Sequence, residues 1–176
     1  MMTKTVIASV LTVMLASFVG VAAADVDQGH GVVNFKGSVI DAPCGIAPES
    51  ADQTIDFGQI SKVQLQQAGG TSAKKSVDIK LVQCDTSTLT KGVSVTFSGL
   101  VSGENTNELM TSGKTNTAIV MTGYGSDVTY GTAHGPLKIG NGDQTLHFTA
   151  AVKAAAGKTV SEGDFTATAN FNMSYE

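Results

Sequence analysis

Apolar and polar residues alternate along most of the chain after residue 30, in short runs that Gly, Asn, Asp and Ser separate. This period of two is typical of β-strands with one buried face. The turn-rich stretches 69–75, 99–117 and 123–142 are predicted surface loops, and 63–68 fits a short helical turn ended by Gly69 and Gly70. The pattern predicts an all-β sandwich or barrel with strands over Val33–Ile40, Gln53–Phe57, Ser76–Cys84, Val93–Ser98, Ala118–Thr122, Thr145–Lys153 and Asp164–Tyr175.

The last of these strands carries the strongest alternation. Gly163 supplies a turn before it, and Thr, Asn and Ser occupy the positions between its apolar residues. A sandwich does not normally end on its longest core strand, because an uncovered strand edge promotes aggregation. We therefore expect a further strand to cover the apolar face formed by Phe165, Ala167, Ala169, Phe171, Met173 and Tyr175.

The N-terminal residues have the layout of a secretory signal peptide. Lys4 precedes an apolar run from Val6 to Val21, and alanines occupy positions 22–24. We predict a signal peptide over residues 1–23, with cleavage after Ala23 or Ala24. A transmembrane anchor is the alternative interpretation, but the run is shorter than the roughly 20 apolar residues that a spanning helix needs. The protein is therefore expected to be exported.

The remaining candidate chemistry is sparse. Two cysteines, Cys44 and Cys84, form an even pair in an exported chain, which favours a disulfide over the alternative of two buried free thiols. The three histidines, His30, His134 and His147, lie far apart, and no ligand spacing links them to a cysteine. We therefore expect no metal and no cofactor.

Composition also argues against two classes of function. The net charge is -4 and the 11 Lys and Arg residues are dispersed, so nucleic acid is not an expected partner. The chain has no Gly-x-Ser-x-Gly motif, and the glycines at 123 and 125 precede no Lys-Ser or Lys-Thr of a phosphate loop. The sequence favours a protein that is not an enzyme; a secreted β-sandwich enzyme is the alternative from another class.

Four segments in a fixed order carry a family resemblance. They are Gly29–Cys44 (GHGVVNFKGSVIDAPC), Gln53–Ile60 (QTIDFGQI), the region around Cys84, and Gly163–Tyr175 (GDFTATANFNMSY). These segments resemble the major pilins of the chaperone-usher pathway, in the P-pilus, mannose-resistant Proteus-like and type 1 fimbrial group. The resemblance covers nearly all of the chain after the predicted signal peptide.

The resemblance implies an incomplete immunoglobulin-like β-sandwich that lacks its final strand. Residues 24–35 would be an N-terminal donor-strand extension and residues 36–176 the pilin domain, with Cys44 and Cys84 joining the first two strands. The protein would be a structural subunit of a surface fimbria that polymerises by donor-strand exchange and supports adhesion. A minor adaptor pilin is the alternative within the same pathway.

The resemblance also implies partners and site residues. Identical subunits, a periplasmic chaperone, an outer-membrane usher, and minor pilins or a tip adhesin would be partners. The inward face of the donor strand would be Gly29, Gly31, Val33 and Phe35, although alternation alone also permits the opposite face with Val26, His30 and Val32. The acceptor and chaperone-binding strand would be formed by Gly163, Phe165, Ala167, Ala169, Phe171, Met173 and Tyr175.

Overall fold

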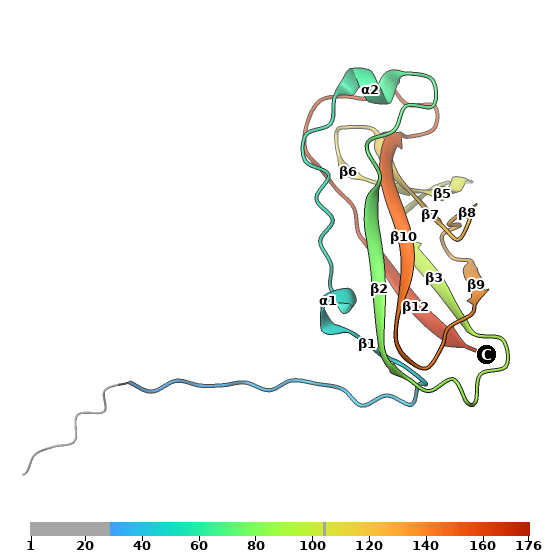
Figure 1. Ribbon diagram of the computed structural model, residues 1–176. Helices are drawn as coiled ribbons and strands as arrows, with labels where there is room; N and C mark the ends of the chain where they lie inside the picture. Colours follow the sequence, from blue (N-terminus) through green and yellow to red (C-terminus); the bar gives the residue numbers. More distant parts are fainter. Residues whose placement is uncertain (1–28, 104) are drawn as a thin grey trace, which may run out of the picture. The chain divides into compact units, whose positions relative to one another are not determined.

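The computed structural model describes residues 29–103 and 105–176, so the predicted signal peptide lies outside the described residues. The chain divides into two units, residues 1–38 and 39–176. In the first unit, residues 29–38 form neither helix nor strand. The second unit contains the strands and two short helices (Figure 1).

The elements of the second unit follow the chain in an almost all-β order. They are β1 (Gly45–Ile46), α1 (Pro48–Ala51), α2 (Lys62–Gln66), β2 (Lys75–Cys84), β3 (Val93–Gly99), β4 (Val101–Ser102), β5 (Asn105–Met110), β6 (Ser112–Gly113), β7 (Thr117–Gly123), β8 (Ser126–Asp127), β9 (Ala133–Leu137), β10 (Gly142–Ala154), β11 (Phe165–Thr166) and β12 (Ala169–Tyr175).

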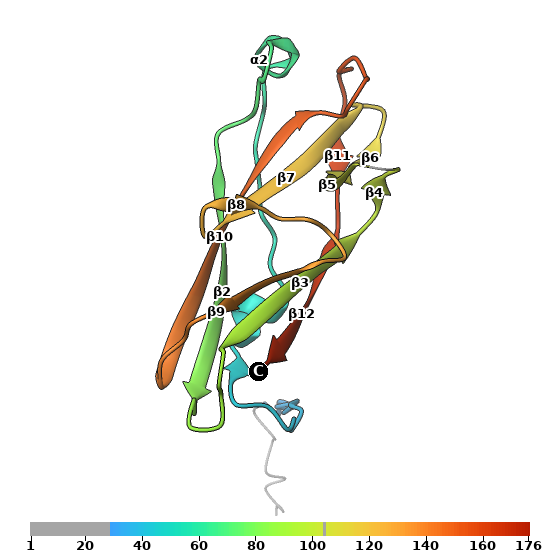
Figure 2. The same cartoon turned by 90° about the vertical axis from the view of Figure 1, so that its right-hand side faces the viewer.

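The strands form two main sheets. The larger sheet has the order β1-β2-β10-β7-β5-β4, with β8 beside β7, and the smaller has the order β12-β3-β9. A third pairing joins β11 to β6, and every strand pair is antiparallel. Figure 2 shows β3 and β12 side by side, with β9 along the other edge of β3.

The core lies between the two main sheets. Ile79 and Leu81 of β2 are fully buried, as is Val95 of β3. Across the sheets, the rings of Phe97 and Phe148 meet edge to face with centroids 5.0 Å apart. These alternating inward positions are the ones that the period-two pattern predicts.

A disulfide joins the start of the unit to the end of β2. Cys44 directly precedes β1, and its Cα lies 4.2 Å from the Cα of Cys84. Because β1 pairs with β2 only at Gly45–Ile46, the disulfide secures a short strand that has few hydrogen bonds of its own.

The predicted strands over β2, β3, β7 and β10 are confirmed, and α2 is the predicted helical turn, with Gly69 at φ +72° after it. The predicted loops 99–117 and 123–142 are wrong, because they contain β4 to β6 and β8 to β9. In β5 the inward residue Glu108 is buried, and its carboxylate pairs with Lys153. Because this core position holds a charged residue, β5 lacks the alternating apolar pattern by which a strand is predicted.

Three other predictions need correction. Residues 33–40 do not form a strand, because a strand requires a partner and the described residues offer them none. Residues 53–57 lie between α1 and α2 without strand pairing. The predicted strand Asp164–Tyr175 is divided into β11 and β12, since residues 167–168 leave the pairing with β6 before the pairing with β3 begins.

Candidate functional site

Strand β12 lies at the edge of its sheet. It pairs with β3 along its whole length, from Ala169 opposite Gly99 to Tyr175 opposite Val93. On its other side, no strand of the described part of the chain pairs with it. The backbone groups along that edge can therefore hydrogen-bond an added strand.

The inward face of β12 is incompletely covered. Phe171, Met173 and Tyr175 pack against the core cluster but are only half-buried. Their neighbours in β3, among them Val93 and Val95, are fully buried. Partial burial also raises the pKa of the Tyr175 phenol. The contrast between paired positions of adjacent strands shows that apolar surface is exposed along one side of β12.

The end of β12 is held in a fixed position. The main-chain oxygen of Glu176 accepts hydrogen bonds from three consecutive N–H groups, those of Thr90 (2.9 Å), Lys91 (2.8 Å) and Gly92 (3.1 Å). Lys91 Nζ also lies 2.8 Å from a carboxylate oxygen of Glu176. Such a cradle of backbone N–H groups fixes β12 along β3.

A second wall faces the segment that leads into β12. Residues 53–61 rise from α1 to α2 (Figure 1), and the ring of Phe57 lies 6.4 Å from that of Phe165. Ile55 to Lys62 and Val160 to Phe165 line a cavity of about 870 Å³. We call this cavity, together with the exposed face of β12, the groove. The sequence predicted the wall formed by β12. The alternation in 53–57 was the feature of the sequence that could have indicated the other wall, residues 53–61.

Helix α2 closes one end of the groove. Leu65 is buried, and Gln66 Nε2 donates to the carbonyl of Val160 at 3.5 Å. An exposed ion pair joins Lys62 to Glu162 at 3.7 Å. These contacts connect the two walls close to Gly163, which itself lines the cavity.

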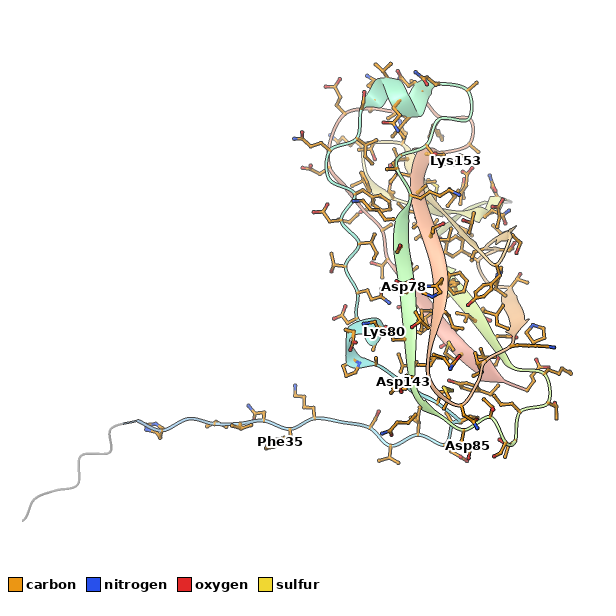
Figure 3. The ribbon with its side chains drawn as sticks, in the orientation of Figure 1. Phe35, Asp78, Lys80, Asp85, Asp143 and Lys153 are labelled. Carbon is orange, nitrogen blue, oxygen red and sulfur yellow. A yellow bond between two sulfur atoms is a disulfide. The ribbon has the colours of Figure 1, made fainter. Side chains whose placement is uncertain are left out.

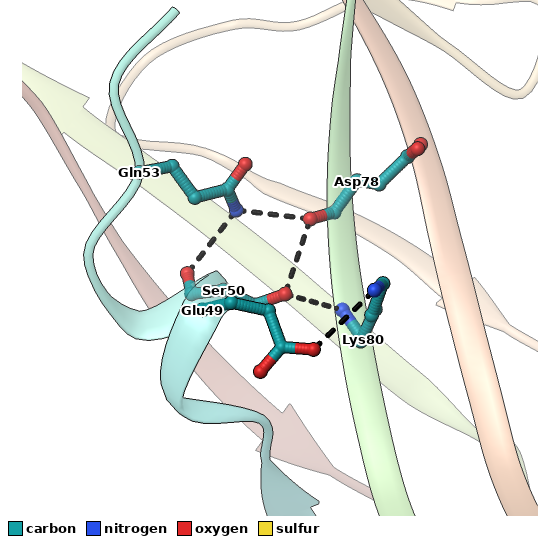
Figure 4. Close-up of polar contacts among 5 residues, drawn as sticks. All are labelled: Glu49, Ser50, Gln53, Asp78 and Lys80. Atoms are coloured by element: carbon teal, nitrogen blue, oxygen red, sulfur yellow. Dashed lines mark hydrogen bonds and ion pairs between the residues drawn. The ribbon is translucent and has the colours of Figure 1, made fainter.

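Helix α1 occupies the outer edge of β2 (Figure 4). The Ser50 hydroxyl accepts a hydrogen bond from the Lys80 N–H at 2.9 Å and donates to the Asp78 carbonyl at 3.3 Å. Gln53 Nε2 donates to the same carbonyl at 2.9 Å. Side chains thus satisfy backbone groups that a neighbouring strand would otherwise bind.

The predicted donor segment presents apolar side chains to solvent. Phe35 is 91% exposed, and Val32 and Val33 are also largely exposed. Figure 3 shows the Phe35 ring projecting from an extended backbone. A row of such side chains on a short segment is a feature of interaction sites.

The histidines and acidic residues do not assemble a metal site in the described residues, where no group of three potential ligands occurs. His147 lies on an exposed strand face, and its Nδ1 is 2.8 Å from Asp78. A second hollow, of about 570 Å³, lies beside it and is lined mainly by β7, β8 and β10. No helix among the described residues is long and apolar enough to cross a membrane.

The fold and the groove define a class: an immunoglobulin-like sandwich with an uncovered edge where a final strand would lie. Comparison with known families gives the family itself. Residues 33–176 match the model for the fimbrial protein family, and the chain belongs to that family. It is a structural, polymerising subunit of a fimbria, and so part of a fibre on the cell surface.

Relatives match over almost their full length. The chain is 47% identical to the F7-2 fimbrial protein of Escherichia coli, covering 99% of this chain and all of the relative. It is 47% identical to the Fimbria A protein of Serratia marcescens, over 98% of each. Both relatives are named as proteins of fimbriae.

Solved structures agree with the fold. A subunit of a chaperone-usher pilus, in a structure concerned with rod uncoiling, matches with a TM-score of 0.82 and 41% identity over 88% of this chain and all of that one. The P pilus rod subunit PapA matches with a TM-score of 0.72 and 41% identity, over 77% of this chain and all of PapA.

Proposed function

We propose that the chain polymerises by donor-strand exchange, in which the N-terminal segment of one copy fills the groove of the next. The observation that carries the proposal is the half-buried apolar face of an edge strand, in a chain that also exposes its own apolar segment. Adding a strand to β12 would satisfy its free backbone groups and cover Phe171, Met173 and Tyr175.

The two walls suit a single inserted strand. Backbone groups of β12 supply affinity that does not depend on sequence, and side-chain pockets supply specificity. Alternate residues of the donor, Gly29, Gly31, Val33 and Phe35, would face inward. The acceptor residues would be Gly163, Phe165, Ala167, Ala169, Phe171, Met173 and Tyr175, of which Ala167 lies in the short unpaired step between β11 and β12.

An uncovered groove is a hazard before assembly, because exposed apolar edges aggregate. We infer that a periplasmic chaperone lends a strand to the groove after export, with residues 1–23 removed as a signal peptide. An outer-membrane usher would then exchange that strand for residues 24–35 of an incoming copy, and minor pilins or a tip adhesin would share the fibre. Residues 36–176 would form the pilin domain.

A deletion separates the role of the N-terminal segment as donor from the role of the groove as acceptor. A chain without residues 25–33 keeps its groove but loses the donor, so it should fold with the chaperone and should not extend a fibre. Electron microscopy of cells that express this variant alone should show no fibres of normal length. A matched variant with 25–33 replaced by a Gly/Ser segment of equal length controls for length, and should fail in the same way. Normal fibres from either variant would refute the mechanism.

A substitution in the groove tests the acceptor strand, β12. Phe171→Asp places a charge on a face that packs against the core, where an unpaired charge is strongly disfavoured. Soluble subunit and its complex with the chaperone should both fall, as measured by co-purification. The control, Asn172→Asp, places the same charge on the exposed face and should leave both yields close to those of the unsubstituted chain.

A further inference from the structure

We propose that the hollow beside His147 binds a neutral saccharide unit, with the ring of Tyr124 as the aromatic surface on which the sugar stacks. The volume of the hollow, about 570 Å³, lies within the range of about 300 to 1,000 Å³ that small-molecule sites occupy. The residues that line the hollow are not among those that line the groove. The inference therefore goes beyond polymerisation.

The floor of the hollow is a row of polar side chains on the outward face of the larger sheet. In the pairing of β8, β7 and β10, Thr122 lies opposite Asp127 on one side and opposite Thr149 on the other. The hydroxyls of Thr122 and Thr149 are 2.8 Å apart, so one donates to the other and the pair retains one hydroxyl proton that this bond does not use. Three adjacent strands thus present hydrogen-bonding groups to one space.

The ring of Tyr124 is held in place at the side of this row. It meets the ring of Phe148 edge to face at 5.7 Å and lies 6.2 Å from the ring of His134. Its phenol oxygen accepts a hydrogen bond from the backbone N–H of His147 at 3.4 Å. Although these contacts fix the ring, the residue remains 52% exposed. Tyr124 therefore presents a pre-positioned aromatic surface to the hollow.

The backbone at Tyr124 does not favour tyrosine. Tyr124 and Gly125 form the two-residue turn between β7 and β8, with φ angles of +51° and +82°. Two positive φ angles define a turn in which Asn, Asp or Gly is preferred at the first position. A bulky residue with positive φ is strained, and such strain is found at functional sites. The exposed ring supplies a reason for tyrosine that the turn does not.

The lining indicates an uncharged ligand with many hydroxyl groups. Lys74 and Asp127 bring one positive and one negative charge, so the lining does not select a strongly charged molecule. Within residues 29–103 and 105–176, the side chains of Lys74, Ser126 and Asp127 have no hydrogen-bond or ion-pair partner, so they are available to a ligand. Sugar hydroxyls both donate and accept hydrogen bonds, and the C–H face of a pyranose ring is apolar, as stacking on Tyr124 requires.

Polymerisation multiplies the effect of such a site. Each copy in a fibre carries the same hollow, so a surface that displays many sugars can bind several copies at once. Linked sites bind with an avidity that exceeds the affinity of one site by a factor on the order of 10² to 10⁴. Weak binding by a single open hollow is therefore sufficient for attachment of a fibre.

The experiment applies purified fibres to an array of immobilised glycans. The array carries oligosaccharides that end in neutral hexoses or N-acetylhexosamines, with sialylated and sulfated oligosaccharides for comparison. Fibres of the unsubstituted chain should bind one or more of the neutral glycans. Fibres that bind no glycan, or only the charged ones, would overturn the proposal.

Tyr124→Asn separates the ring from the turn. Asn tolerates positive φ and is preferred in this turn, so fibres should assemble and the melting temperature should change by less than about 4 °C. Binding to the neutral glycans should fall at least about tenfold, because the stacking surface is lost. Any minor subunit in the fibres is unchanged in this variant, so binding that persists at full strength would place the sugar elsewhere and refute the site.

A second variant does not alter the turn. Asp127→Asn keeps the shape of the side chain but removes the carboxylate acceptor, and should weaken binding about tenfold with fibre yield unchanged. The matched control, Leu100→Asn, changes a largely exposed apolar residue outside the hollow and should bind as the unsubstituted fibres do. Equal binding by Asp127→Asn and Leu100→Asn fibres would also overturn the assignment.

Discussion

A self-complemented subunit tests the vacancy beside β12 directly. Residues 25–37 are deleted, and a copy of 26–39 is appended after Glu176 through Asn-Gly, which forms a two-residue hairpin turn. Because a tight turn can join only antiparallel strands, this link lets the copy fold back antiparallel to β12. The product is expected to be a monomer that needs no chaperone, because it carries its own final strand and no free donor.

The magnitude follows from the side chains that the groove would cover. In a matched control, the appended copy carries Val33→Ser and Phe35→Ser. Burying Val and Phe contributes about 1.5 to 3 kcal/mol each, so the two appended copies should differ by about 3 to 6 kcal/mol in the free energy of unfolding. For a domain of this size, 1 kcal/mol shifts the melting temperature by about 2 to 4 °C, which gives a difference on the order of 10 °C.

The assay combines thermal unfolding, followed by circular dichroism, with sedimentation to establish the monomer. The truncated chain without an appended copy should melt lowest or aggregate. If the unsubstituted and control copies melt at the same temperature, or if the truncated chain is as stable as the fused one, the groove does not bind this strand and the reasoning fails.

Four further variants test the stability of the domain itself. Glu108→Ala should destabilise the domain by about 1 to 2 kcal/mol in urea unfolding, because it leaves the Ala156 N–H and the partly exposed Lys153 ammonium without their acceptor. Burial raises the pKa of Glu108, but hydrogen bonds from Lys153 and a backbone N–H outweigh this effect and hold the pKa below the ordinary value of 4.5. Glu108→Gln should therefore reduce the free energy of unfolding by its full amount above about pH 5. The difference from the unsubstituted chain should shrink as the pH falls through the lowered pKa. Replacing Cys44 and Cys84 by Ser opens a loop closed over a separation of 40 residues, and should cost about 4 kcal/mol in the same assay. Gly92→Ala should lower the melting temperature by several degrees, since a Cβ there would overlap a backbone carbonyl of β9 and displace the N–H cradle at the end of β12.

The long alternating strands could be predicted because each buries one face. The missed strands show where that signal fails: β5 contains the buried Glu108, whose partners come from β10 and the loop after it. Such pairing depends on residues 45 positions away, which a local pattern does not contain. The half-exposed face of β12 was predictable. The alternation in 53–57 predicted a strand, but it did not show that these residues line the groove, because they reach it without strand pairing.

The position of α1 has a consequence for the architecture of the fibre. A monomer with two reactive ends yields a linear polymer, and a monomer with three yields a branched network. At Asp78 and Lys80, α1 occupies the edge of β2 and prevents a strand from docking there. Under the proposed mechanism, each subunit would then have a valence of two, with one donor and one acceptor at β12. A variant with Ser50 and Gln53 replaced by Ala would raise that valence, and its fibres should bundle side by side.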